Sequence, residues 1–132
     1  MPQLAQVIHN RNELNAMQGE SYVRSVQLYN ADVLKNKGYT YGQAGWGAEF
    51  GLINVDDPTQ VYAVANTANG KMTWSADGLL VWAFTALETA LWTFERAAYY
   101  LDVVVPTSKF DPQGSRLNID RGQITVITHS QP

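Results

Sequence analysis

Few side chains in this sequence could do chemistry, and none of them forms a known catalytic motif. His9 and His129 are the two histidines, and they lie near opposite ends of the chain. A zinc site would need cysteines or a compact cluster of histidine and acidic ligands, and the sequence contains no cysteine. Neither a G-x-S-x-G elbow nor a G-x-x-x-x-G-K-[ST] phosphate loop is present. We therefore predict no metal and no other cofactor.

Acidic residues occur in two places where they could bind a metal or act on a glycoside. Asn54, Asp56 and Asp57 supply the oxygen ligands that calcium prefers, but a calcium loop needs more regularly spaced acids. The Asp-Asp-Pro sequence at 56–58 is typical of a turn. Glu88 and Glu95 resemble a carboxylate pair for glycoside hydrolysis, yet beside a helical turn they are better explained as cap and surface charges. We predict that the protein is not an enzyme.

Aromatic residues are the remaining candidates for function, with four tryptophans and seven tyrosines in the chain. Aromatic side chains are enriched in protein interfaces, and on a β-sandwich they can stack on sugar rings. The alternation of the predicted strands directs five of them toward the core: Trp46, Phe50, Trp82, Phe84 and Tyr99. Three others have no obvious inward position and are our candidate contact residues: Tyr62, Trp92 and Tyr100.

Length and composition are typical of a single folded domain. The 132 residues are 45% hydrophobic and 16% charged, which is enough to bury a core and too apolar for a disordered chain. A net charge of -3 argues against nucleic acid, because phosphate binding needs dense lysine and arginine. No apolar run approaches the about 18 residues of a membrane span, and no signal peptide is visible. The lack of cysteine suits a reducing cytoplasm.

The elements that must position these residues are mostly strands. In SYVRSVQLYN (21–30), Tyr22, Val26 and Leu28 share one face with Arg24. Further strands are predicted at 45–53, 60–66, 79–85, 98–105 and 116–128. In the strand at 98–105, Asp102 points away from the apolar face, so its charge need not be buried.

Turn and cap signals connect the strands. The Asn-Gly pair at 69–70 predicts a hairpin, and glycines at 42–45 and at 122 mark changes of strand face that a β-bulge would explain. Thr85 and Glu88 form a capping-box pattern for one short helix. About seven strands with one helical turn predict an all-β fold, a β-sandwich of Greek-key type.

We divide the chain into an N-terminal arm at 1–17 and a β-sandwich domain at 18–132. Leu4, Val7 and Ile8 give the arm an apolar side with partial helical spacing. The arm could be a short helix, an extra strand, or a segment exchanged with a neighbouring copy. These three residues are therefore further candidates for an interface.

Six stretches, taken in order, carry a resemblance to a known family. They are QGESYVRSVQLYN (18–30), GWGAEFGLI (45–53), ANGKMTW (68–74), FTALETALW (84–92), YYLDVVV (99–105) and RGQITV (121–126). The set resembles the immunoglobulin-like N-terminal domain of tailed-phage baseplate and receptor-binding tail proteins, the baseplate upper protein type. The resemblance covers most of residues 18–128, and it implies that the Greek-key β-sandwich of about seven strands is immunoglobulin-like.

The resemblance implies a non-enzymatic structural protein of a tailed-bacteriophage virion, assembled in the host cytoplasm. We expect a baseplate, tail-fibre attachment or neck adaptor or decoration component. It would form a homo-oligomer and bind other virion proteins through edge strands, loops and the N-terminal arm, without nucleic acid or membrane. The alternative is a carbohydrate-binding β-sandwich module in which surface tyrosine and tryptophan contact a host glycan.

Overall fold

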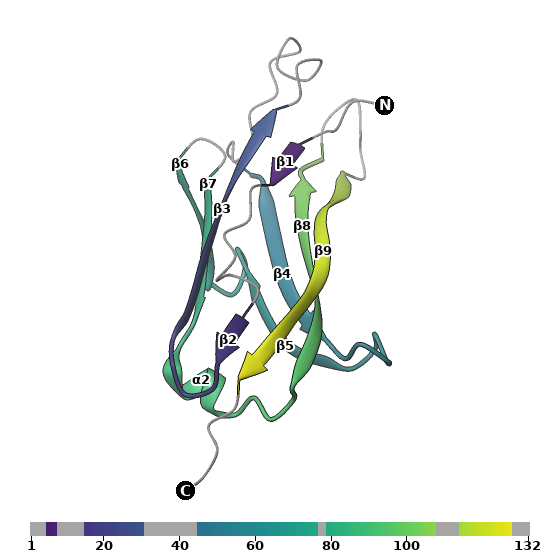
Figure 1. The fold of residues 1–132 in the computed structure, drawn as a ribbon. Helices are drawn as coiled ribbons and strands as arrows, with labels where there is room; N and C mark the ends of the chain where they lie inside the picture. The colour runs from purple at the N-terminus through teal and green to yellow at the C-terminus, as the bar shows by residue number, and fades with distance from the viewer. Residues whose placement is uncertain (1–4, 8–14, 31–44, 77–78, 108–113, 128–132) are drawn as a thin grey trace, which may run out of the picture.

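The chain folds into a sandwich of two β-sheets, seen here in a computed structural model that describes residues 5–7, 15–30, 45–76, 79–107 and 114–127 (Figure 1). One sheet contains, in spatial order, β1 (Ala5–Val7), β3 (Tyr22–Asn30), β7 (Leu79–Phe84) and β6 (Met72–Ala76). The other contains β2 (Asn15–Met17), β9 (Ser115–Ile127), β8 (Arg96–Val105), β4 (Gly47–Ile53) and β5 (Val61–Asn66). Among the described residues, α2 (Ala86–Ala90) is the one helix. The predicted all-β sandwich with one short helix is confirmed.

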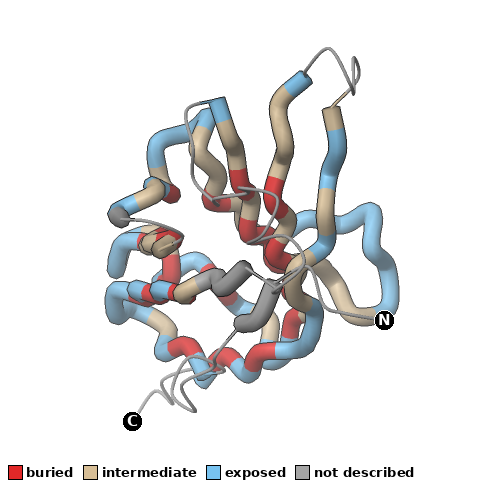
Figure 2. The backbone as a smooth tube through the Cα atoms, turned by 90° about the horizontal axis from the view of Figure 1, so that it is seen from above, coloured by how far each residue is buried: buried red, intermediate tan, exposed pale blue. Residues whose placement is uncertain are grey.

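The core lies between the sheets, and buried residues recur along the long strands (Figure 2). On β8 the inward positions are Ala97, Tyr99, Leu101 and Val103, all buried, while the residues between them are half-buried. Asp102 is one of the latter, so the predicted outward position of this aspartate is confirmed. Of the five aromatic residues predicted for the core, four are buried and Trp46 is partly buried against them.

The core also encloses a charged side chain, Arg24 of β3. Arg24 is 2% exposed and shares its face with buried Tyr22 and Val26, as the alternation predicted. Its guanidinium carbon lies 5.4 Å from the ring centroids of Phe50 and Trp82 and 4.9 Å from that of Tyr99. A cation at such distances is attracted by the ring faces. Three strands of two sheets, β4, β7 and β8, therefore supply the surroundings of this cation.

Helix α2 begins at the capping box that the sequence predicted. The Thr85 hydroxyl accepts a hydrogen bond from the Glu88 amide at 3.2 Å, and the Glu88 carboxylate accepts one from the Thr85 amide at 2.9 Å. These bonds satisfy amides that the first turn of a helix leaves open. Lys71 also pairs with Glu88 at 2.6 Å, which ties the helix to the start of β6.

The hairpin predicted at Asn69 and Gly70 is wrong. The strands on either side of this turn, β5 and β6, belong to different sheets and do not pair. Gly70 does adopt the left-handed conformation of a tight turn, with φ of 80°. A dipeptide specifies a local reversal, whereas the pairing partner depends on which strand surfaces can be buried together. The hairpin in this region joins β6 to β7, whose residues Ala76 and Leu79 are partners.

A bulge does occur in the last strand, but not at the predicted glycine. Leu101 pairs with Asp120 and Asp102 pairs with Asn118, so the extra residue of β9 is Ile119. Gly122 instead faces Tyr99, and a Cβ at Gly122 would come within 2.8 Å of the Tyr99 ring. The glycine makes room for a ring across the strand pair. The other predicted change of face, at 42–45, lies outside the described residues except for Gly45, whose φ is 88°.

The described parts of residues 1–17 are strands of the sandwich. β1 pairs with β3, and β2 runs parallel to the end of β9. Ala16 of β2 is 1% exposed, so this part of the predicted arm contributes to the core of its own chain. Val7 lies in β1, while Leu4 and Ile8 lie outside the described residues. Both strands lie in the segment predicted as an arm, for which an extra strand was one of the three possibilities.

Candidate functional site

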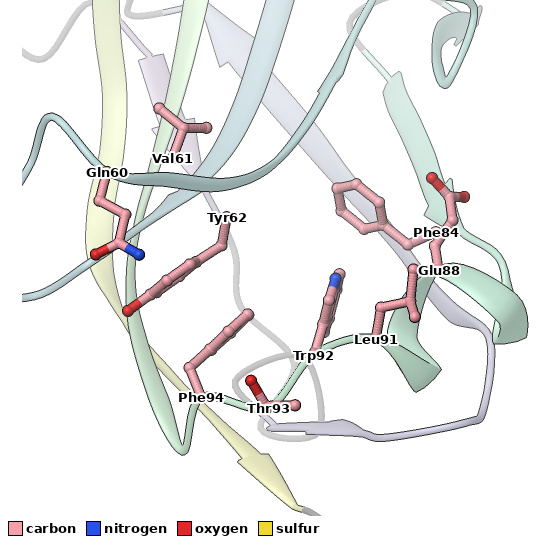
Figure 3. A pocket seen from close by; sticks show the side chains of 9 residues that line it. All are labelled: Gln60, Val61, Tyr62, Phe84, Glu88, Leu91, Trp92, Thr93 and Phe94. Carbon is pink, nitrogen blue, oxygen red and sulfur yellow. The ribbon is translucent and has the colours of Figure 1, made fainter.

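Two of the three candidate aromatic residues, Tyr62 and Trp92, line one pocket of about 560 Å³ (Figure 3). The pocket lies between the start of β5, helix α2 and the loop from α2 to β8. Its lining residues are Gln60, Val61, Tyr62, Phe84, Glu88, Leu91, Trp92, Thr93 and Phe94. Tyr100, the third candidate, lies elsewhere, beside a second pocket on the outer face of the five-stranded sheet.

A set of hydrogen bonds fixes α2 at the edge of this pocket. The Gln18 side-chain amide donates to the carbonyls of Ala90 and Trp92 at 3.2 and 3.0 Å. Thr89, which is fully buried, accepts from the Gly19 amide at 3.0 Å and donates to the Glu20 carbonyl at 2.8 Å. The turn between β2 and β3 thus holds the helix in place. This half of the pocket is preformed.

The aromatic residues of the pocket pack mainly on one another. Tyr62 and Phe94 stack with their ring centroids 4.0 Å apart and their planes 7° apart. Phe94 in turn lies 5.7 Å from Trp92, and Trp92 meets Phe84 edge-on at 5.2 Å. Trp92 is only 4% exposed, so it is a core residue and not a surface contact. Phe94 was not predicted as a candidate, because it lies in a loop where strand alternation gives no direction.

Large apolar side chains are exposed around the pocket. Leu91 is 80% exposed, Leu87 lies one helical turn before it at 83%, and Val61 on the opposite wall is 53% exposed. Met17 and Ile127 are paired residues of β2 and β9 and are also exposed, and Gln18 connects them to α2. We call these five residues the apolar end of the sandwich. Exposed apolar side chains on and beside a pocket are a candidate interaction site.

The outer face of the five-stranded sheet carries a polar network around Glu49. The Glu49 carboxylate accepts hydrogen bonds from the Tyr100 hydroxyl at 2.6 Å, from Arg116 at 2.7 Å and from the Asn66 side chain at 3.1 Å. Arg116 also pairs with Asp102 at 2.8 Å. The aspartate inside the apolar run of β8 is therefore one end of a carboxylate–guanidinium–carboxylate bridge across three strands. Tyr100 belongs to this network, so its hydroxyl is occupied within the chain.

The network shifts the acidities of its members. Partial burial raises the pKa of Glu49, but the hydrogen bonds from Tyr100, Arg116 and Asn66 outweigh this effect, and the pKa lies below its usual value of 4.5. The pKa of Tyr100 is raised, first by burial and then by its hydrogen bond to the Glu49 carboxylate. Both groups keep their ordinary charge near neutral pH, which suits a structural role.

Acid should therefore weaken the fold through Glu49. Because the folded pKa is lowered, the stabilisation is complete above the unfolded pKa and is lost as the pH falls through the folded pKa. We expect Glu49→Gln to have a lower free energy of unfolding than the parent chain at about pH 7. This difference in free energy should shrink toward about pH 3. Urea unfolding of both proteins across this pH range measures the difference in free energy of unfolding. A difference that stays constant with pH would contradict the assignment.

The residues considered for metal binding or catalysis lie in a turn, at a helix cap and on an exposed loop. The Asn54 side chain accepts from the Asp56 amide at 2.8 Å, and Asp57 accepts from the Thr59 amide at 3.1 Å, as in a turn. Glu88 caps α2, and Glu95 is exposed on the loop before β8. Within the described ranges no cluster of three or more metal-ligating side chains occurs. His9 and His129 lie outside the described residues.

The part of the chain that the structure describes contains no helix long and apolar enough to cross a membrane. Comparison of the sequence with models of protein families and with curated proteins finds no match.

Proposed function

We propose that this protein is a non-enzymatic structural component of a tailed-phage virion, at the baseplate, the fibre attachment point or the neck. It would assemble with copies of itself and with other virion proteins through the apolar end. The observation that carries this proposal is the exposure of Leu87, Leu91 and Val61 around a preformed pocket. Such a surface suits burial against apolar side chains of another protein.

The order of the strands supports the immunoglobulin-like part of the proposal. An immunoglobulin sandwich has its first, second, fifth and fourth strands in one sheet, and its third, sixth and seventh in the other. Without the short β2 and the additional β5, the seven strands of this chain are, in sequence order, β1, β3, β4, β6, β7, β8 and β9. The first, second, fifth and fourth of these (β1, β3, β7 and β6) form one sheet, and the third, sixth and seventh (β4, β8 and β9) lie together in the other. The additional β5 beside β4 corresponds to the extra strand of variable-type domains.

We expect Leu91→Asp to weaken self-association about tenfold or more, because a carboxylate would have to be desolvated at the centre of the contact. The measurement is the mass by light scattering over about a hundredfold range of concentration, with Leu87→Asp as a second variant. Val23→Asp is the matched control, since Val23 is an apolar residue of β3 that is 63% exposed and does not belong to the apolar end. A parent protein that remains monomeric, or equal dissociation by Val23→Asp, would argue against this surface.

A glycan is the second candidate ligand, because polar side chains line the same pocket as Tyr62. Gln60, Glu88 and Thr93 offer hydrogen bonds of the kind that orient a sugar. Against this, Phe94 lies between Tyr62 and Trp92, so the rings occupy one another's faces. Titration with host-type oligosaccharides, followed by tryptophan fluorescence, tests it. Saturable quenching that Tyr62→Ala abolishes would favour the glycan.

A further inference from the structure

The free edge of the five-stranded sheet has peptide groups that a further strand could bond. β5 is the last strand of this sheet among the described residues. The Thr67 amide donates to the Ala48 carbonyl at 3.1 Å, so this position faces β4. Because peptide groups alternate in direction along a strand, those of Val64 and Asn66 face away from β4. An edge of this kind can add a strand from a second copy.

The Asn69 side chain occupies these outward groups. Its amide nitrogen donates to the Val64 carbonyl at 3.1 Å, and its oxygen accepts from the Asn66 amide at 3.0 Å. The same oxygen accepts from the Lys71 amide at 3.0 Å. A carboxamide has the donor and acceptor of a peptide group. Asn69 therefore bonds to β5 as a residue of a neighbouring strand would.

The other end of β5 is irregular. Ile53 pairs with Val61 and Leu52 pairs with Ala63, so Tyr62 is an extra residue of β5. A bulge bends a strand and interrupts the regular spacing that a partner strand needs. The regular part of the β5 edge is therefore the part at Val64 and Asn66, to which the Asn69 side chain bonds.

We propose that Asn69 closes the edge of the five-stranded sheet and so prevents two copies from joining through their β5 strands. The occupant it excludes is a second copy of β5, paired antiparallel about a two-fold axis. Association of the protein is thereby confined to other surfaces. Binding through edge strands was one of the modes that the resemblance implied, and at this edge the Asn69 side chain opposes it.

The test is Asn69→Ala in a Leu91→Asp background, so that contacts through the apolar end do not contribute. We expect the mass from light scattering to rise toward twice the monomer mass over about a hundredfold range of concentration, while the background protein stays monomeric. Val64→Pro removes an outward N–H, and proline is tolerated on edge strands. Adding Val64→Pro to Asn69→Ala should return the protein to a monomer.

Asn54→Ala is the matched control, because Asn54 also stabilises a turn but does not bond to the peptide groups of β5. It should leave the mass unchanged. A monomeric Asn69→Ala protein, or association that survives Val64→Pro, overturns the proposal. If Asn69→Ala fails to fold, amide exchange in the parent protein decides the matter. The Asn66 amide should then exchange at least about tenfold more slowly than the Val64 amide, and equal rates overturn the proposal.

Discussion

Replacing Arg24 by alanine is expected to lower the free energy of unfolding by about 3–5 kcal/mol, as for a large side chain removed from a core. Arg24 is 2% exposed, so truncation leaves a cavity among Phe50, Trp82 and Tyr99. It also removes the attraction between the cation and the ring faces, worth up to about 2 kcal/mol where both are desolvated. Urea unfolding at neutral pH, followed by tryptophan fluorescence, measures the change.

Arg96→Ala is the control for this prediction, because Arg96 is exposed at the start of β8. Its effect should stay within about 0.5 kcal/mol. Arg24→Met separates packing from charge, since methionine fills much of the same space without a cation. We expect it to remain within about 1.5 kcal/mol of the parent protein, as for swaps that roughly conserve volume. If Arg24→Ala lowers the free energy of unfolding no more than Arg96→Ala does, the described surroundings of Arg24 are wrong.

Gly51→Ala is expected to destabilise the protein by about 1–3 kcal/mol, the usual cost of overpacking. Gly51 lies opposite Tyr100 on the neighbouring strand. A Cβ at Gly51 would overlap Cε1, Cζ and Oη of Tyr100, so the ring would have to leave its place. The hydrogen bond from its hydroxyl to Glu49 would then be lost as well. Thermal and urea unfolding of the variant measure the loss.

The cause can be isolated with a double-mutant cycle. In Tyr100→Ala the ring is absent, so adding Gly51→Ala should cost little, and the two changes should be strongly non-additive. Tyr100→Phe keeps the ring and loses only the hydroxyl, so Gly51→Ala should remain costly in that background. If Gly51→Ala costs the same with and without the Tyr100 ring, the overlap is not its cause.

Much of the secondary structure followed from the sequence. Alternation placed Arg24 on the same face as Tyr22 and Val26, and it placed Asp102 on the outer face of β8. The capping box at Thr85 and Glu88 predicted where α2 begins. These features depend on residues close together in the chain, because helix caps and strand faces are set by local geometry.

The candidate site was predicted less well. Tyr62 and Trp92 were singled out because strand alternation gave them no inward direction, and they do line one pocket. Trp92 is nonetheless buried, and Phe94 and the exposed leucines were not recognised. Residues in loops have no fixed periodicity, so their directions depend on the elements that they contact.

Alternation, turn residues and the capping box were enough to predict an all-β chain, the inward faces of most of its strands and the start of its helix. The folded chain, and not its local sequence, shows that the turn at Asn69 joins two sheets and that the Asn69 side chain bonds to the free edge of β5. The folded chain also shows what surrounds Arg24, whose three aromatic neighbours come from β4, β7 and β8. Strand pairing and core contacts join residues distant in sequence, and because their free energy depends on what is buried together, local patterns do not specify them.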